Sequence, residues 1–600
     1  MGSNRDTSAP VANGYPEPVF QAFTIKTTSG RARQKAGNAV TDVLGPGWQV
    51  ENYGGRGRNF EIYKEEGELT PPEAWELVYQ LRAHRGVISA EPVFKAWVTD
   101  RMDWAINLGA AEAAPRPDAA VFEGVLEWPC GQGDDFQKAK EREWSLDIAG
   151  VKQAWANHFP GGNNKEGEGV IIGHPDTGYR KHPEITGNLL VDKGFDLFDN
   201  DNDPTDELEG GFGRNPGHGT GTASVIVSPK GPPSGTPPNF VSGAAPAAKL
   251  IPFRVSNSVV ILDGLNLARA IEKAADADVH VISISMGGLG SERLHDAVVY
   301  AKNKGVIVLA AAGNCVGFVV FPAAYEEVVA VAACDAEKSV WRGSSRGAAV
   351  DVTAPGDRVW RAVANPDDDL DNVAQGSGTS FAVATVAGIA ALWLAKHGRN
   401  KIIQACGGKE KIASTFIQLL RATATPMPGW PPGQFGGGLV NADRLLAAPL
   451  PDGTTEPIMV AAPEGHAPVS RGGIITFSHL FDEAMRADLG VRNMPTADEP
   501  IDSRARLNAT LSTLMNTTEG ALPADLGQVG QELAFYLATD PILYRRFAEA
   551  VSPHGSGPSQ AEGVAAFDTS APASQNIEEV RQQLLLKGVS PALAAKLRKQ

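Results

Sequence analysis

Between Trp144 and about Leu450, short runs of apolar residues alternate with longer segments in which apolar residues recur at helical spacing. The strand-like runs include Gly169–Gly173, Val279–Ser285 and Val306–Ala311, and the helical segments include Leu262–Ala275 and Ser291–Lys304. A strand that is apolar along its whole length is buried on both faces, and strands that are joined through helices run parallel. The sequence therefore predicts an α/β domain over residues 144–450, with helices on both faces of a parallel sheet.

A different pattern precedes this domain, over residues 18–99. Strand and helix signals follow one another there in the order βαββαβ, which is the ferredoxin-like arrangement. The strands are expected at Val19–Thr27, Trp48–Tyr53, Asn59–Lys64 and Val87–Val98, and the first helix at Arg31–Leu44. A second helix is expected to begin at Thr70, which can form a capping box with Glu73. An α+β domain of this kind implies no function by itself.

Composition divides the rest of the 600 residues. Residues 1–17 are polar and expected to be disordered, and residues 100–143 contain an Ala- and Pro-rich stretch typical of a linker. Residues 451–551 predict a mainly helical region, and residues 552–574 a second linker rich in Gly, Ser and Pro. Residues 575–600 predict a helical hairpin, in which Gly588 ends one helix and Pro591 begins the next.

Charge and cysteine usage limit the partners and the compartment. The net charge is −16, which argues against a nucleic-acid partner because phosphate binding needs a basic face. No segment is expected to be apolar over the length of a membrane span, and the N-terminus lacks the apolar core of a secretory signal. The four cysteines form no metal-ligand pattern, and free thiols in a reducing compartment are the simplest reading. A cytoplasmic protein is expected.

Three polar residues stand where an α/β domain places chemistry. Asp176 follows an apolar strand, His218 lies between glycines at the start of a helix, and Ser380 precedes an apolar helix. Each has a structural alternative, because Asp-Thr-Gly is a good turn, a lone histidine is more often structural, and a serine before a helix is commonly its cap. Asn314 ends another buried strand between His218 and Ser380, and its amide can donate a hydrogen bond to an oxyanion.

Together these residues belong to six short blocks that occur in one order. The blocks are Pro175–Gly178, His218–Thr220, Ser285–Gly288, Ala312–Asn314, Ala354–Gly356 and Gly378–Ser380. With them, the chain resembles the subtilisin-like serine proteases (the subtilases) from Trp144 to about Ala447, roughly half of its length. The order Asp, His, Ser is the one known for subtilisin.

The resemblance implies a role for each residue. Ser380 would be the nucleophile, His218 the general base and then acid, and Asp176 the carboxylate that orients the imidazole. Asn314 and the backbone N–H of Ser380 would form the oxyanion hole. The residues expected to bind substrate are Ser285, Met286, Gly287, Gly288, Ala312, Gly313, Cys315 and Val320. Among the wall residues, Val320 is branched and no carboxylate falls in these segments, so small or medium apolar side chains are expected before the cut bond, with Glu326 and Glu327 as the nearest acidic residues in sequence.

The chain also departs from the family pattern. Ala384 stands where a proline is usual after the nucleophile, and Gly221 and Thr222 replace the more frequent His-Val after His218. None of these changes removes a catalytic group.

Residues 18–99 look like the inhibitory propeptide of the family, with Val87–Pro92 similar to its last strand. A latent protease is therefore expected, which cuts itself within 97–144 and is released by an activating or regulatory protein at the C-terminal region. Two alternatives remain open: the small domain has another role, or the whole chain is a catalytically idle peptide-binding scaffold on the same fold.

The resemblance implies no cofactor for the chemistry, but proteins of this family often use calcium for stability. The densest acidic stretch begins at Asp199, and its clustered oxygens suit Ca²⁺ although it is not an EF-hand loop. Asp199, Asp201 and Asp203 are the candidate metal ligands, with a solvated loop as the alternative.

Overall fold

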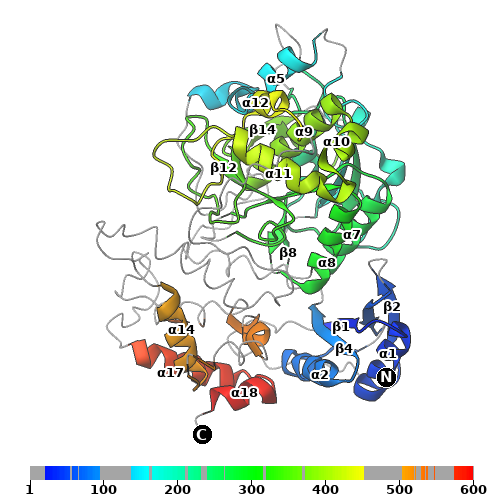
Figure 1. Ribbon diagram of the computed structural model, residues 1–600, viewed down its shortest axis with the longest axis vertical. Coiled ribbons are helices and arrows are strands. Elements are labelled where there is room, and N and C mark those ends of the chain that lie inside the picture. The colour runs from blue at the N-terminus through cyan, green and yellow to red at the C-terminus, as the bar shows by residue number, and fades with distance from the viewer. Residues whose placement is uncertain are drawn as a thin grey trace, which may run out of the picture. The chain divides into compact units, whose positions relative to one another are not determined.

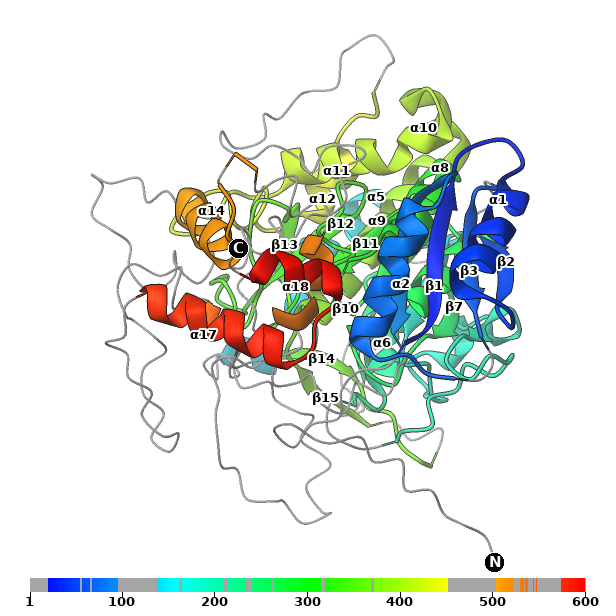
Figure 2. The ribbon, with the colours of Figure 1, turned by 90° about the horizontal axis from the view of Figure 1, so that it is seen from below.

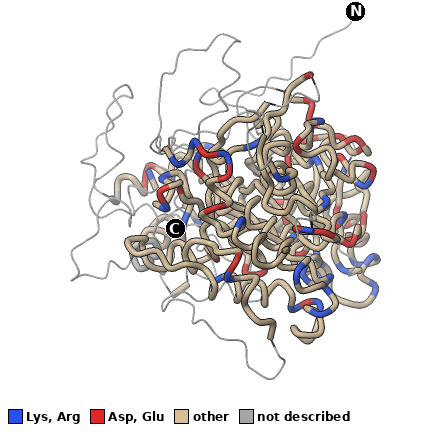
Figure 3. The backbone as a smooth tube through the Cα atoms, turned by 90° about the horizontal axis from the view of Figure 1, so that it is seen from above, with Lys and Arg blue, Asp and Glu red and all other residues tan. Residues whose placement is uncertain are grey.

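The computed structural model describes residues 20–53, 57–64, 67–94, 137–160, 165–209, 214–231, 240–261, 264–288, 290–314, 319–367, 372–451, 503–518, 520–521, 529–533, 535–537, 543, 546–547 and 573–598. The chain forms two compact units (Figure 1). The larger unit comprises Ile106–Leu507 and Val551–Ala571. The smaller unit is assembled from Met1–Ala105, Asn508–Ala550 and Pro572–Gln600. The expected linker 100–143 lies largely outside the described residues, as do 1–17 and 552–572, and basic and acidic residues are interspersed over the described chain (Figure 3).

A seven-stranded sheet of parallel strands forms the centre of the larger unit, in the order β13-β12-β11-β9-β5-β7-β6. The strands are β5 (Ile171–Asp176), β6 (Phe195–Asp196), β7 (Lys249–Arg254), β9 (Val281–Ile284), β11 (Ile307–Ala311), β12 (Val329–Cys334) and β13 (Val352–Pro355). Two small pairs accompany it: β8 (Val260–Ile261) runs parallel to β10 (Gly287–Gly288), and β14 (Val359–Ala362) runs antiparallel to β15 (Val373–Gly376). The predicted α/β class is confirmed.

Helices cover both faces of this sheet because successive strand residues point to opposite sides. In β11, Ile307 and Leu309 pack into one hydrophobic cluster with α9 (Thr379–His397), while Val308 and Ala310 pack into a second cluster with α7 (Leu265–Asp276) and α8 (Glu292–Asn303). The helices are α4 (Trp144–Ile148), α5 (Val151–His158), α6 (His218–Val227), α7 (Leu265–Asp276), α8 (Glu292–Asn303), α9 (Thr379–His397), α10 (Arg399–Cys406), α11 (Ile412–Thr423) and α12 (Ala442–Ala447), with 3₁₀ turns at Gln137–Lys140, Thr186–Asn188, Val191–Lys193 and Lys409–Lys411.

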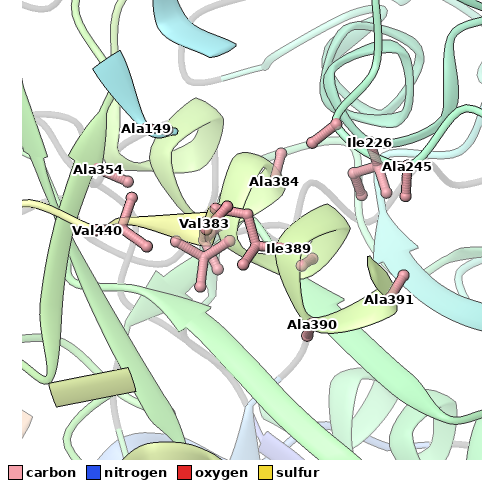
Figure 4. Packing of buried hydrophobic residues seen from close by; sticks show 14 of the residues in the cluster. Ala149, Ile226, Ala245, Ala354, Val383, Ala384, Ile389, Ala390, Ala391 and Val440 are labelled. Carbon is pink, nitrogen blue, oxygen red and sulfur yellow. The ribbon is translucent and has the colours of Figure 1, made fainter. Parts of the chain in front are cut away.

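Helix α9 lies at the centre of the first cluster, where its Val383 and Ile389 pack among small residues of neighbouring elements (Figure 4). Among the described helices, it is long and apolar enough to cross a membrane by length and composition. The prediction that no segment is apolar over the length of a membrane span is therefore wrong for α9. However, 89% of the apolar window is buried inside the protein, as in the core helix of a folded domain.

The N-terminal part of the smaller unit has the predicted βαββαβ order (Figure 2). Its elements are β1 (Phe20–Thr27), α1 (Ala32–Ala39) continued by a π-helical turn (Val40–Leu44), β2 (Gln49–Tyr53), β3 (Asn59–Tyr63), α2 (Pro71–Ala83) and β4 (Val87–Phe94). The strands form an antiparallel sheet in the order β2-β3-β1-β4. The capping box predicted for α2 is present, with the backbone N–H of Thr70 donating to Glu73 over 2.9 Å.

C-terminal segments complete the same unit. They include α14 (Ser503–Leu514), α17 (Ala573–Leu586) and α18 (Pro591–Leu597), and Ser590 caps α18 as the sequence predicts. The buried carboxylate of Glu532 joins three parts of the chain. It accepts hydrogen bonds from the Tyr79 hydroxyl of α2 (2.8 Å) and from the backbone N–H (2.8 Å) and hydroxyl (2.6 Å) of Ser590. Phe535 adds ring contacts with Phe20 and Trp75.

Candidate active site

The residues that the sequence predicts to be catalytic lie at the carboxyl edge of the parallel sheet and at the starts of two helices beside it. Asp176 is the last residue of β5, and Asn314 follows β11. His218 begins α6, and Ser380 lies in the first turn of α9. Gly219 permits this arrangement, because a Cβ there would lie 2.1 Å from the carbonyl oxygen of Gly178.

Asp176 and His218 are in direct contact. His218 Nδ1 lies 2.7 Å from Asp176 Oδ1, which also accepts the backbone N–H of Thr177 over 2.8 Å. Asp176 is fully buried. Burial by itself raises the pKa of this carboxyl, but the charge and hydrogen bond of His218 outweigh it and hold the pKa below its usual range. Asp176 is therefore an ionised carboxylate that fixes the orientation of the imidazole.

A second histidine, which the sequence analysis missed, stands beside this pair. His174 Nε2 lies 3.0 Å from Thr222 Oγ1 and 3.7 Å from Asp176 Oδ2. Thr222 Oγ1 lies 3.2 Å from the same carboxylate oxygen. A histidine inside an otherwise apolar strand was the signal that could have revealed it.

The hydroxyl of Ser380 is held by a backbone carbonyl. Its Oγ donates to the carbonyl oxygen of Ser285 over 3.0 Å, and the hydroxyl of Ser285 donates to the carbonyl oxygen of Ser380 over 3.0 Å. Within the part of the chain that the structure describes, no hydrogen bond joins Ser380 to His218. The structure thus brings the nucleophile candidate to the same edge as the Asp176–His218 pair but records another hydrogen-bond partner for it.

Asn314 is oriented by its neighbours in α9. Its Oδ1 accepts the backbone N–H of Thr379 over 2.9 Å and the Thr379 hydroxyl over 2.8 Å. Since the carbonyl end of the amide is engaged, Nδ2 points the other way. A Cβ at Gly378 would lie 3.3 Å from Nδ2 and 3.8 Å from Ser380 Oγ, so the amide N–H groups and the nucleophile candidate flank the same point.

The segment predicted to bind substrate, Ser285–Gly288, makes several contacts of its own. Gly287 pairs with β8 and its N–H donates to the carbonyl oxygen of Val259, while the N–H of Gly288 donates to that of Phe321. The side chain of Met286 is buried in the second hydrophobic cluster.

Val320 lies where the predicted pocket wall should be. A Cβ at Gly287 would lie 2.5 Å from one Val320 methyl, and a Cβ at Gly313 would lie 3.0 Å from the other. The N–H of Val320 donates to the carbonyl oxygen of Ala312, so the wall is tied to that segment. The other wall candidate, Cys315, lies outside the described residues.

The two acidic residues nearest to this wall in sequence are otherwise placed. Glu327 Oε2 lies 3.0 Å from His295 Nε2, and Glu326 is exposed. Glu327 is therefore engaged by His295, and Glu326 faces solvent.

The acidic stretch does not assemble the predicted metal set. Asp199 pairs with Arg254, Asp201 accepts the N–H of Asp203 over 2.8 Å, and Asp203 accepts from the N–H and hydroxyl of Thr205. These carboxylates close local turns and an ion pair instead of converging. Among the described residues, no three His, Cys, Asp or Glu side chains form a group that could hold a metal ion. The residues present do not fit the calcium ion expected here.

Of the four cysteines, two fall in the described chain. Cys334 is buried and Cys406 is half-buried, and both are free thiols. Burial raises the pKa of the Cys334 thiol, so it stays protonated and acts as an apolar core residue. Cys130 lies outside the described residues, like Cys315.

Comparisons with known proteins find similar sequences for the part of the chain that contains this site. The model of the subtilase family matches residues 167–428. Thermitase from Thermoactinomyces vulgaris is 35% identical over 238 residues, which cover 39% of this chain and 78% of thermitase. A thermophilic serine proteinase from Bacillus sp. (strain AK1) is 36% identical over 244 residues, which cover 40% of this chain and 55% of that protein.

Among solved structures, one example with a similar fold can be named. It is fervidolysin from Fervidobacterium pennivorans, a keratinolytic enzyme related to subtilisin, with a TM-score of 0.52 and 22% sequence identity. The match covers 74% of this chain and 63% of fervidolysin.

Proposed function

Since this chain belongs to the subtilase family, we propose that it is a serine endopeptidase whose catalytic triad is Asp176, His218 and Ser380. One observation carries the proposal: a buried, ionised Asp176 holds His218 Nδ1 at 2.7 Å at the sheet edge where α9 presents Ser380. An imidazole held in this way through Nδ1 has Nε2 available as a general base, which supports the proposal.

The chemistry follows from the groups present. Ser380 Oγ leaves the carbonyl of Ser285, gives its proton to His218 Nε2 and attacks the peptide carbonyl carbon, which forms a tetrahedral oxyanion. The imidazolium, stabilised by Asp176, then protonates the leaving amine, and the acyl-enzyme remains. A water molecule, deprotonated by His218 in the same way, releases the acid and restores Ser380.

The oxyanion would be stabilised by Asn314 Nδ2 and by the backbone N–H of Ser380. The two hydrogen bonds from Thr379 to Asn314 Oδ1 support this role, since they hold the amide in one orientation before substrate arrives. The N-terminus of α9 adds a favourable field for developing negative charge.

A serine-reactive fluorophosphonate tests the proposal. The wild-type protein should be labelled on Ser380, as peptide mapping would show, and should cleave an unfolded protein substrate. Ser380→Ala should lose both the label and the cleavage while keeping its circular dichroism spectrum. Retained cleavage in pure Ser380→Ala protein would refute the triad.

A second candidate is a catalytically idle peptide-binding protein on this fold. It draws on one observation: the hydroxyl of Ser380 donates to the carbonyl oxygen of Ser285 and not to His218. For that function, the wild type would bind unfolded peptides without labelling or cleavage, and the fluorophosphonate experiment separates the two.

The residue before the cut bond is proposed to be small or medium and apolar. The support is Val320, whose methyl groups stand against Gly287 and Gly313 and would make the pocket shallow. A Lys or Arg side chain would lose water there without gaining a carboxylate.

Latency is the finer part of the proposal. Residues 20–94 have the ferredoxin-like order expected of an inhibitory propeptide, so we expect self-cleavage within 97–144 and a regulatory partner at the C-terminal region. Mass spectrometry after incubation should find a processed wild type and a full-length Ser380→Ala protein. Equal masses would make the N-terminal domain a permanent part. The cytoplasmic location stays a prediction.

A further inference from the structure

The polar network behind Asp176 extends beyond the proposed triad. His174, Thr222 and Asp176 are all buried, with 1%, 0% and 0% of their surface exposed. A buried polar side chain is costly unless it is hydrogen-bonded, so each partner in such a cluster matters. We propose that His174 acts through Thr222 as a positioning residue for the catalytic carboxylate, in a relay His174–Thr222–Asp176–His218. This inference rests on the proposed function.

The direction of the hydrogen bonds follows from the proton of Thr222. A threonine hydroxyl carries one hydrogen, and four oxygen or nitrogen atoms lie near its Oγ1. Two are the carbonyl oxygens of His218 (3.2 Å) and Gly219 (3.3 Å), which the N–H groups of the next helical turn already serve. The other two are Asp176 Oδ2 and His174 Nε2. An ionised carboxylate is the strongest acceptor of the four, so the hydroxyl donates to Asp176.

This assignment fixes the tautomer of His174. With its hydrogen on Asp176, Thr222 can only accept from His174, which must therefore carry its proton on Nε2. Burial lowers the pKa of His174, so it stays neutral next to His218. The opposite tautomer would take the Thr222 hydrogen and leave Asp176 Oδ2 with no close donor.

The two carboxylate oxygens of Asp176 then accept hydrogen bonds from different donors. Oδ1 accepts from His218 and the N–H of Thr177, and Oδ2 accepts from Thr222. A carboxylate held through both oxygens cannot rotate about its last bond, which keeps Oδ1 aimed at His218. The hydrogen bonds from Thr177 and Thr222 also spread the negative charge of the carboxylate. They therefore weaken its attraction for a protonated His218.

Charged groups of several neighbouring elements lie around this cluster. Its own strand supplies Asp176, and α6 supplies His218. The buried carboxylate of Asp206 accepts from the hydroxyl of Thr177 and the N–H of Gly217, and the side chain of the buried Arg361 in β14 packs against Gly221 of α6. Arg254 lies opposite Asp176 in the register of β7, but its guanidinium pairs with Asp196 and Asp199. Strand β9 carries no ionisable residue, and α7 packs on the other face of β5, where Ala274 meets Gly173.

The test compares isosteric variants of the relay. Thr222→Val replaces the hydroxyl by a methyl group and should lower kcat by about 10-fold with KM unchanged, the loss expected for one hydrogen bond to a charged group. The imidazolium should also become harder to deprotonate, so the acidic limb of kcat/KM should move to higher pH. His174→Leu should move the limb in the same direction by a smaller amount. Thr222→Ser, which keeps the hydroxyl, should stay within about twofold of the wild type.

The double variant distinguishes a relay from two separate roles. Because His174 acts through Thr222, the double variant should be no slower than Thr222→Val alone. Thr385→Val is the matched control, since Thr385 is a buried threonine in α9 whose hydroxyl serves the carbonyl oxygen of Phe381. It should leave kcat and the pH profile unchanged.

Active-site titration with the fluorophosphonate gives kcat per folded site, so a partly unfolded variant still answers the question. Additive losses in the double variant, or an acidic limb that does not move, would overturn the relay. If instead Ser380→Ala protein remains active, the proposed function fails, and this outcome is distinct from a failure of the relay.

Discussion

The two units each bury a carboxylate at a junction of distant segments, and the two carboxylates differ in the charge beside them. Asp176 joins β5 to α6 and has His218 at 2.7 Å. Glu532 joins α2 to the cap of α18 and has only neutral donors, Tyr79 and Ser590. Burial raises the pKa of Glu532, and the hydrogen bonds from Ser590 and Tyr79 only partly offset it. The pKa of Asp176 is lowered instead, because burial is outweighed by His218.

This difference indicates how a buried carboxylate that is suited to catalysis can be distinguished from one that holds segments of the chain together. Both carboxylates accept three hydrogen bonds, so the number of hydrogen bonds does not distinguish them. A carboxylate that stays ionised opposite an imidazole can support charge that appears during a reaction. A carboxyl group whose pKa is raised by burial, with neutral donors around it, can hold segments together but offers less charge to support a cation.

The largest expected difference in kcat is between the variants Asp176→Asn and Glu532→Gln. The first change keeps the shape but removes the charge and favours the wrong imidazole tautomer, so kcat should fall by about 10⁴-fold, as in other serine proteases. Glu532→Gln lies in the other unit and should leave kcat unchanged. Initial rates on a protein substrate measure both, and a loss for Glu532→Gln of similar size would contradict the division of roles.

Asn314→Ala should have the next largest effect. Loss of one oxyanion donor lowers kcat by about 10²- to 10³-fold, a magnitude established in subtilisin. KM should change little, because the donor acts on the transition state. Tyr79→Phe, which also removes one donor from a buried oxygen, is the control in the smaller unit and should not alter kcat. An effect confined to KM would place Asn314 in substrate binding.

A peptide-library digest tests which side chain the enzyme prefers before the cut bond. Peptides with Ala, Val or Leu before the cut should be preferred over Lys and Arg, because no carboxylate is placed at Val320 by the contacts of the described residues. Val320→Ala should deepen the pocket and improve Phe relative to Ala by about 10- to 200-fold. Strong cleavage after Lys or Arg would show that a carboxylate reaches the pocket.

The smallest effect concerns the stability of the smaller unit. The pKa of Glu532 is raised on folding, so its contribution is full below the unfolded value and is lost as the pH rises through the folded value. Thermal unfolding of Ser380→Ala protein should show a midpoint for this unit that falls as the pH rises above the unfolded pKa of a glutamate. Glu532→Gln on that background should reduce this fall, because the amide does not titrate. An unchanged pH dependence would mean that Glu532 does not titrate there.

The same contrast explains what could be predicted from the sequence. The parallel sheet and the positions of Asp176, His218 and Asn314 follow from local patterns, because strand ends and helix starts are written in neighbouring residues. The packing of Glu532 against Tyr79 does not, since these residues are far apart in the chain and neither sits in a motif. His174 was overlooked because one polar residue in an apolar strand reads as an exception until Thr222 is seen beside it.

The prediction of a metal site in the acidic stretch that begins at Asp199 was wrong for a related reason. Density of carboxylates along the chain predicts a metal site only when the loop curls their oxygens together. Here Asp201 and Asp203 use theirs to close turns with the residues that follow, and Asp199 turns toward Arg254. Such local competition by backbone N–H groups is invisible in composition.

The interrupted chain of the smaller unit has a consequence for biosynthesis. Its first part, up to Ala105, leaves the ribosome well before Asn508–Ala550 and Pro572–Gln600 are made. During that interval Tyr79 has no Glu532 to bind, and Phe20 and Trp75 lack the cover of Phe535. The nascent N-terminal domain would therefore expose an apolar face while residues 106–507 are translated, and chaperones that bind such faces would have their longest opportunity in that window.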